Sequence, residues 1–241
     1  MKNKRFIIFG KGYLASNIYF LNNKKFQHIE TFNDIKKIKL NSKINYIIYY
    51  FAIRKSKSIN YNLNLYKNLT KYFHNTNYKI IYFSTTEQNK NNYSNIHKEI
   101  EKNIDKTKNL IMRVCQIYGG DISGSNVYGV NGFINQIRSK KFLTINSDYQ
   151  NRRKYLSIFK LNEVIRNKNL SSRNGIIYMA SKKDFSFLEL LKIINKFSRN
   201  KIDVFIKTIE EQKKPKKILY ENRFKKILFN ENFEKNIKKL L

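Results

Sequence analysis

The stretch from Arg5 to Ile18 has residue types and a spacing that could bind a dinucleotide. Four apolar residues, Phe6 to Phe9, precede Gly10 and Gly12, and a helical pattern follows. Gly10 allows a tight turn, Gly12 lets a pyrophosphate approach the backbone, and Ala15 takes the third glycine's place, where helix and strand pack closely. The helix N-terminus then offers free N–H groups and the positive end of its dipole to phosphates. The same G-x-G-x-x-A pattern also fits an ordinary strand–turn–helix unit.

An acid follows the next short strand, Phe26 to Ile29. Glu30 lies 18 positions after Gly12, where a carboxylate can bind the adenosine ribose hydroxyls of NAD. Lys24 and Lys25 lie nearby and favour a 2′-phosphate, so the choice between NAD and NADP stays open. A solvated loop acid is the alternative interpretation of Glu30.

Other kinds of site are not indicated by the composition. The single cysteine, Cys115, excludes a disulfide framework within the chain and a cysteine-based zinc site. The three histidines, at positions 28, 74 and 97, have no metal-ligand spacing, so we expect no metal. The longest apolar run, 46–53, is far short of a membrane span, and the first glycines come too early for a signal peptide. We therefore expect a cytoplasmic protein that does not bind a membrane.

The formal charge of +32 raises the question of nucleic-acid binding. The basic excess is spread along the whole chain, however, and Asn, Ile, Tyr and Phe are also abundant. These residue types and lysine share AT-rich codons, so a biased genome explains the charge at least as well as a nucleic-acid ligand does. We expect no nucleic-acid partner, although a basic surface attracts anionic substrates.

Strand and helix patterns alternate after the first helix. Apolar runs predict strands, and apolar residues at helical spacing predict helices over 60–73 and 93–105. The predicted strands are 44–52, 78–83 and 110–114. This alternation predicts an α/β fold with a Rossmann-like doubly wound parallel sheet.

The pattern changes from Tyr118 onward, where five glycines cluster between positions 119 and 132. We predict a short helix over 133–137, a short strand preceded by Arg152, Arg153 and Tyr155, a strand over 176–180 and a helix over 185–197. The tail from Lys213 is basic and weakly helical. We therefore expect a nucleotide-binding domain over 1–117 and a small C-terminal substrate-binding lobe over 118–241, part of which returns to the first domain.

Several motifs in this order resemble the extended short-chain dehydrogenase/reductase family of sugar-nucleotide epimerases, dehydratases and reductases. The resemblance covers roughly residues 5 to 200. Its motifs are the glycine-rich opening, Phe51-Ala52 with Arg54, Asn62-Leu63 with Asn68-Leu69, Phe83-Ser-Thr-Thr-Glu87, Leu110-Ile-Met-Arg-Val-Cys-Gln-Ile-Tyr-Gly119, and the stretch from Ile176 to Leu190.

This resemblance implies an NAD- or NADP-dependent enzyme that transfers hydride at a carbon of a nucleotide sugar. The implied cofactor-binding residues are Gly10, Gly12, Tyr13, Leu14, Glu30, Phe51, Ala52 and Arg54. Gln116 stands where the family has a substrate-contacting Asn, and Arg153 is the second implied substrate contact. The catalytic residues implied are Thr85, which would hydrogen-bond the substrate oxygen, and Tyr93, the acid/base.

The catalytic pair of the family, Tyr-x-x-x-Lys, is altered here. A tyrosine works near pH 7 only when a cation stabilises its phenolate, since its ordinary pKa is about 10. Position i+4 from Tyr93 is His97, while Lys98 comes at i+5 and lies about 140° around a regular helix. Lys98 reaches Tyr93 only if the helix bulges or begins after Tyr93, and otherwise His97 would be a weaker, pH-dependent cation.

Two further expectations concern the reaction and the assembly. Family dehydratases carry Asp-Glu after the catalytic Thr, whereas this chain has Thr86-Glu87, which favours reduction or epimerisation over dehydration. The alternative is a nucleotide-binding member with lost or altered catalysis, as the displaced lysine suggests. The resemblance also implies a homodimer through helices 60–73 and 93–105, with Tyr61, Leu65 and Ile104 as candidate contacts.

Overall fold

The structure, a computed structural model, describes residues 3–86, 91–121, 130–139, 142–145, 152–198, 203–206 and 225–240. The chain divides into two compact units. The first comprises Met1–Val114, Asn162–Tyr178 and Asn222–Lys226, and the second comprises Cys115–Leu161, Met179–Glu221 and Ile227–Leu241.

The first unit contains most of the strands and helices that the sequence predicts, with bounds that differ by a few residues. They are β1 (Lys4–Phe9), α1 (Tyr13–Phe20), β2 (Phe26–Ile29), α2 (Phe32–Ile35), β3 (Asn45–Tyr50), α3 (Ile59–Phe73), β4 (Asn77–Thr85), α4 (Asn92–Asn103), β5 (Leu110–Val114) and η1 (Lys168–Ser172).

The second unit contains shorter elements. They are β6 (Gln116–Tyr118), α5 (Val130–Ser139), β7 (Phe142–Ile145), β8 (Arg153–Ser157), β10 (Asp184–Phe185), α7 (Phe187–Phe197), β11 (Asp203–Ile206) and α8 (Phe233–Leu240). Three elements have residues in both units, namely α6 (Ile158–Arg166), β9 (Gly175–Ser181) and β12 (Lys225–Phe229).

A seven-stranded sheet has the order β12-β9-β5-β4-β3-β1-β2. The strands β1 to β5 pair in parallel, with Phe9 opposite both Ile29 and Tyr50. From β1 the chain goes to β2 on one side and then to β3 on the other. The carboxyl ends of β1 and β3 therefore form the topological switch point at which doubly wound sheets bind ligands. The predicted Rossmann-like fold is confirmed.

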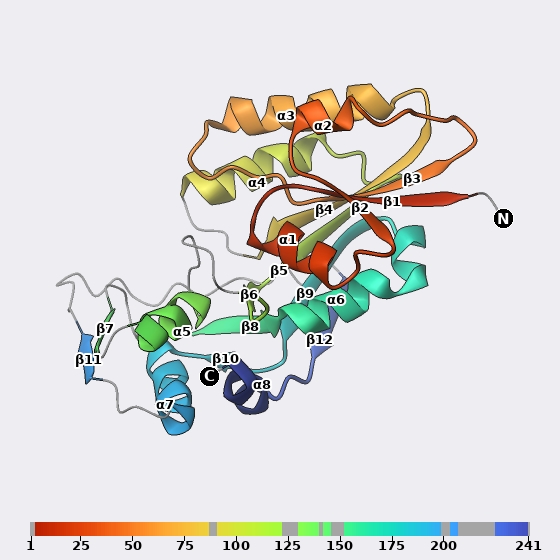
Figure 1. Ribbon diagram of the computed structural model, residues 1–241. Helices are drawn as coiled ribbons and strands as arrows, with labels where there is room; N and C mark the ends of the chain where they lie inside the picture. Colours follow the sequence, from red (N-terminus) through yellow and green to blue (C-terminus); the bar gives the residue numbers. More distant parts are fainter. Residues whose placement is uncertain are drawn as a thin grey trace. The chain divides into compact units, whose positions relative to one another are not determined.

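The helices of the first unit cover both faces of this sheet. Figure 1 shows α3 and α4 over one face and α1 over the other. Alternate strand residues such as Phe9, Ile48 and Tyr82 are buried in one cluster with Leu69 of α3 and Ile100 of α4. Because the strands are buried on both faces, they read in the sequence as continuous apolar runs.

The tail from Lys213 agrees with the prediction only in part, and its residues 213–224 lie outside the described ones. Phe233–Leu240 forms the helix α8, but Lys225–Phe229 forms the strand β12, whose Phe229 carbonyl accepts a hydrogen bond from the Lys182 N–H at 2.8 Å. Phe185 lies in β10 and not in a helix, because Ser186 forms a capping box with Glu189 that starts α7 at Phe187. Arg153 and Tyr155 lie within β8 and do not precede it.

The helices in the described part of the chain are all too short or too polar to span a lipid bilayer.

Candidate functional site

The turn after β1 is fixed by its backbone. Gly10 has a φ of 144°, and a Cβ placed on it would lie 3.0 Å from the carbonyl carbon of Phe51 and 3.1 Å from the amide nitrogen of Ala52. The Phe51 N–H donates to the Phe9 carbonyl at 2.8 Å, so the turn packs directly on the end of β3. Only glycine fits this position, which is the topological switch point of the sheet.

Gly12 differs from Gly10 in what surrounds it. It is the N-cap residue of α1, and a Cβ there would meet nothing within 4 Å. Within the described residues no side chain caps this end of α1. Ala15, one turn into the helix, is fully buried against the strands, as the third position of the pattern requires. The turn therefore leaves open space in front of an uncapped helix N-terminus, which suits a phosphate group.

The predicted nucleotide-binding residues lie around this turn. Tyr13 and Leu14 form the first turn of α1 and are half-buried. Glu30 is exposed and directly follows Ile29, whose carbonyl accepts the Gly10 N–H at 2.9 Å. The ring of His28 contacts the Gly10 carbonyl through Nε2 at 2.7 Å, a contact that sequence analysis missed. The carboxylate of Glu30 thus belongs to the same edge of the sheet as Gly10.

The segment after β3 completes this edge. Phe51 stacks on Phe83 of β4, with ring centroids 4.1 Å apart. The buried Asn62 of α3 accepts the Arg54 N–H at 2.8 Å and donates to the Arg54 carbonyl at 3.1 Å. The backbone around Ala52 and Arg54 is therefore held by one amide side chain, and the Arg54 side chain remains exposed.

Thr85 ends β4 at the same edge of the sheet, opposite Val114 of β5. Thr86 is buried, and its N–H donates to the Val114 carbonyl at 3.1 Å. Glu87, the second residue of the pair that distinguishes dehydratases, lies outside the described residues. Tyr93, the implied acid/base, is half-buried in the first turn of α4.

His97 cannot act as the expected cation. It is 3% exposed, and this burial lowers the pKa of its imidazole to about 3, so it is neutral near pH 7. Tyr82 lies 2.6 Å from His97 Nδ1 through its hydroxyl. Because burial raises the pKa of Tyr82 well above its usual value, the tyrosine remains protonated and donates this bond. The proton of His97 is then on Nε2, which has no hydrogen-bond partner among the described residues.

Lys98 is exposed, and α4 runs as a regular helix from Asn92 to Asn103. The two conditions under which Lys98 would reach Tyr93, a bulge or a later helix start, are therefore not met. Five residues of regular helix rotate its side chain about 140° away from Tyr93. The ring of Tyr93 contacts that of His97, with centroids 4.5 Å apart and the ring planes at 82°.

The implied substrate contacts lie in the second unit. Gln116 is opposite Tyr155 in the parallel pair of β6 and β8, and Arg153 is two residues before Tyr155. Side chains two apart on a strand share a face, so Gln116 and Arg153 are on the same face of this three-stranded sheet. The Arg153 guanidinium lies over the ring of Phe187, 5.6 Å from its centroid.

Comparison with known proteins identifies the fold. No protein-family model and no curated protein matches the sequence. Among solved structures, UDP-N-acetylglucosamine 4-epimerase from Bacillus cereus matches with a TM-score of 0.72 and 17% identity over 99% of this chain and 95% of that one.

Two further structures were solved with a nicotinamide cofactor. The UDP-glucose 4-epimerase of Thermus thermophilus, in complex with NAD, has a TM-score of 0.61 and 14% identity over 83% of this chain and 85% of that one. RMD from Pseudomonas aeruginosa, complexed with NADPH, has a TM-score of 0.67 and 10% identity over 84% and 87%. At such identities the likeness establishes the Rossmann-like fold, which is the fold that the resemblance in the sequence implies.

Proposed function

We propose that this chain binds NAD or NADP at the carboxyl edge of its seven-stranded sheet and reduces or epimerises a nucleotide-activated sugar. The turn at Gly10 and Gly12 carries this proposal. The backbone of Phe51 and Ala52 excludes every other residue type from position 10, while Gly12 faces open space. This combination suits a ligand that approaches the backbone at the start of α1.

The residues of the turn fit a dinucleotide. Gly12 and the N-terminus of α1 would hold the pyrophosphate, and Glu30 would accept hydrogen bonds from the adenosine ribose. Lys24 and Lys25, both exposed, would favour the 2′-phosphate of NADP. When bound, the cofactor supplies or accepts the hydride. The side chains of Phe51, Ala52 and Arg54 would border it, with Arg54 as an exposed cation.

The remaining roles belong to side chains around the substrate. Thr85 would hydrogen-bond the reacting oxygen, Tyr93 would hold or transfer its proton, and Gln116 and Arg153 would bind the nucleotide sugar. The substrate class is supported by the neighbours, among which are UDP-N-acetylglucosamine 4-epimerase and UDP-glucose 4-epimerase. The basic composition of the chain favours such an anionic substrate.

A second candidate function is nucleotide binding with lost or altered catalysis. The observation that favours it is the state of α4, where His97 is neutral and Lys98 points away from Tyr93. A tyrosine is an effective base near pH 7 when a cation stabilises its phenolate, and neither of the two expected residues supplies that cation here. The two candidates share the cofactor site and differ only in turnover.

We also propose a cytoplasmic homodimer in which α3 and α4 form the interface. Tyr61 is exposed and Leu65 is half-buried, so both remain candidate contacts. Ile104 is buried in the core of the first unit and is therefore not a contact. Sedimentation at micromolar concentration tests the assembly, and a monomer there would contradict it.

The decisive experiment is a search for a co-purifying dinucleotide by mass spectrometry, followed by titration with NAD and NADP. We expect one of the two cofactors to bind. Adding a nucleotide sugar should then change the absorbance of the bound cofactor in the near ultraviolet, where reduced nicotinamides absorb. Cofactor binding without turnover of any nucleotide sugar would select the second candidate. Absence of binding to either cofactor would reject both.

A further inference from the structure

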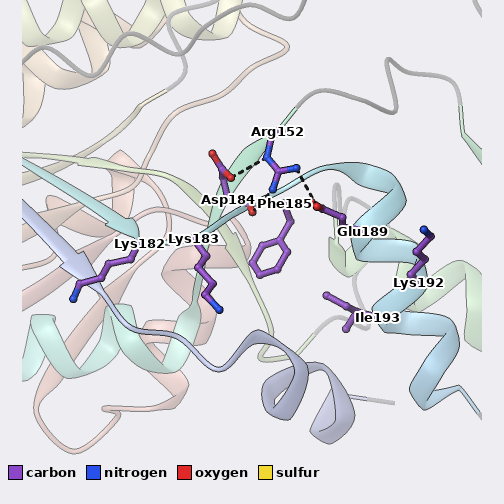
Figure 2. Close-up of a pocket in the computed structure, with 8 residues that line it drawn as sticks. All are labelled: Arg152, Lys182, Lys183, Asp184, Phe185, Glu189, Lys192 and Ile193. Atoms are coloured by element: carbon purple, nitrogen blue, oxygen red, sulfur yellow. Dashed lines mark hydrogen bonds and ion pairs between the residues drawn. The ribbon is translucent and has the colours of Figure 1, made fainter.

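Figure 2 shows a pocket beside β10 and α7, in which Arg152 pairs with Asp184 and Glu189. Phe185 of this pocket lies directly opposite Arg153 in the β8–β10 pair. The pocket therefore adjoins a substrate contact that is already proposed, and it belongs to that site. A second pocket, with a volume of about 610 Å³, lies in the first unit at the amino edge of the seven-stranded sheet and has no role in the proposed function.

The second pocket is built on the first residues of three adjacent strands. Lys4, Asn45 and Asn77 begin β1, β3 and β4 and line the pocket. They lie in one row across the sheet, because Asn45 is opposite Lys4 on one side and opposite Asn77 on the other. Gly10 follows the other end of β1, about 20 Å away at a rise of roughly 3.3 Å per residue. A small ligand in this pocket is therefore well separated from the candidate nucleotide site.

Two lysines of the pocket converge on the chain segment at the end of η1. The Lys4 ammonium donates to Ser171 Oγ at 3.3 Å. The Lys79 ammonium donates to the Arg173 carbonyl, two residues further along, at 2.6 Å. Burial, together with the neighbouring charge of Lys4, lowers the pKa of the half-buried Lys79. The two ammonium groups are therefore close enough to repel each other.

The charge of these two lysines is not balanced by the protein. Neither Lys4 nor Lys79 forms an ion pair with a carboxylate in the described part of the chain. Asp105, an acid that lines the pocket, accepts the N–H of Thr107 at 2.9 Å and its hydroxyl at 2.6 Å, and its charge interacts with that of Lys108. With Asp105 and Lys108 offsetting each other, the other two lysines leave an excess of positive charge that an anion would neutralise.

The row of residues beside Lys4 offers neutral hydrogen-bonding groups. The side-chain amides of Asn45 and Asn77 have no hydrogen-bond partner among the residues that the structure describes. Neighbouring strands lie about 4.8 Å apart, so each amide is within reach of a small ligand held at the lysines. An amide both donates and accepts hydrogen bonds, as a sugar hydroxyl does.

We propose that this pocket binds a sugar phosphate, with its phosphate beside the ammonium groups of Lys4 and Lys79 and its hydroxyl groups at Asn45 and Asn77. Lysine ammonium groups are compact charges that suit a phosphate dianion. Pockets that bind small organic molecules have volumes of roughly 300–1,000 Å³, a range that includes this one. None of these four residues takes part in the proposed reaction, so this site and the proposed function stand or fall separately.

Isothermal titration of the full chain with glucose 6-phosphate and with inorganic phosphate tests the proposal. The pocket variant K4Q/K79Q removes both lysines, and the surface variant K67Q/K71Q removes the same charge from exposed positions of α3, in the same unit and outside the pocket. We expect the pocket variant to weaken the binding of both ligands by about tenfold or more and the surface variant to leave it unchanged. Lys4→Gln alone, at an exposed position, should weaken both ligands by a smaller factor, which keeps the test valid if Lys79→Gln does not fold.

Three further variants locate the two parts of the ligand. N45A/N77A should weaken glucose 6-phosphate but not inorganic phosphate. Gly12→Val and Arg153→Gln, at the other candidate sites, should both keep the binding of glucose 6-phosphate. Circular dichroism checks that each variant is folded.

The proposal is overturned if the wild type binds neither ligand or if the surface variant weakens binding as much as the pocket variant does. It is also overturned if Gly12→Val or Arg153→Gln abolishes the binding of glucose 6-phosphate, because the ligand would then occupy one of the other sites. If glucose 6-phosphate binds no more tightly than inorganic phosphate, the role of Asn45 and Asn77 is overturned.

Discussion

The glycine turn after β1 and the first turns of α4 belong to the same unit but are determined in different ways. At the turn, the backbone of Phe51 and Ala52 leaves room only for Gly10, and the ligand would contact backbone N–H groups. In α4, the chemistry depends on which side chains stand beside Tyr93. A site made of backbone groups tolerates a diverged sequence as long as its glycines remain. A site made of side chains on a helix does not, because moving a residue by one position turns its side chain by about 100° around the helix.

The strongest test of this difference places one substitution at both glycines. Gly12→Val should leave a folded protein that has lost NAD and NADP binding, because a Cβ at this position has no protein atom within 4 Å but lies in the space that the pyrophosphate would occupy. Gly10→Val should instead prevent folding, because its Cβ would lie 3.0 Å from backbone and φ is 144°. Thermal unfolding and cofactor titration measure the two effects. Unchanged affinity in Gly12→Val would remove the turn from the site.

On the side of α4, Tyr93→Phe should abolish turnover and spare cofactor binding. The substitution removes only the hydroxyl, and the ring keeps its contact with His97. A loss of about 10²–10⁴-fold in kcat is expected of a group that transfers a proton. Steady-state kinetics on a nucleotide sugar, with a separate binding assay for the cofactor, checks this. Normal turnover of the variant would mean that the mechanism of the family does not apply to this chain.

Substitutions of His97 and Lys98 should have smaller effects than Tyr93→Phe, and the two should differ in whether they change stability. His97→Gln should destabilise the fold by about 1–3 kcal/mol, because the buried hydroxyl of Tyr82 loses its acceptor. Lys98→Met should change neither stability nor kcat much, since Lys98 is exposed on the far side of the helix. Denaturant unfolding and kinetics of both variants give the ranking. A large loss of kcat in Lys98→Met with normal stability would contradict the described geometry of α4.

The last prediction concerns the pH dependence of stability. The pKa of His97 is about 3 in the folded chain and about 6.5 when unfolded, so the unfolded state binds more protons between these values. Stability from this group is therefore complete above pH 6.5 and decreases by about 1.4 kcal/mol per pH unit as the pH falls toward 3. Unfolding of the wild type and His97→Gln between about pH 6.5 and about pH 4.5 measures this slope. The variant should lack the contribution, and identical slopes would show that His97 titrates normally.

The sequence predicts the parts of this fold that rest on continuous patterns. The buried strands Phe6–Phe9 and 110–114 and the helix 60–73 appear because apolar runs and helical spacing depend on neighbouring residues only. The glycine turn is found for the same reason, since G-x-G-x-x-A is a local spacing. That pattern could not show that Phe51 and Ala52 enclose Gly10, because the contact joins two strands that are distant along the chain.

The rest depends on contacts between distant residues. The neutral state of His97 follows from its burial and from Tyr82, neither of which a spacing reveals. Glu231 is another example, since its carboxylate accepts the Ser157 N–H and the Tyr118 hydroxyl at 2.9 Å each, although it lies in a tail that looked uninformative. The boundaries of the C-terminal lobe also depend on distant contacts, because α6 and β9 each have residues in the first unit. A local pattern does not show to which unit a helix or strand belongs.

The strand β12 has a consequence for the order in which the protein is made. It lies beside β9 at one end of the seven-stranded sheet, but its residues, Lys225–Phe229, leave the ribosome after those of β9, Gly175–Ser181. Until then the β9 edge presents unpaired backbone groups that can pair with another chain. The sheet is therefore completed only once β12 has been synthesised, and a chaperone that shields the β9 edge until then would raise the yield of folded protein.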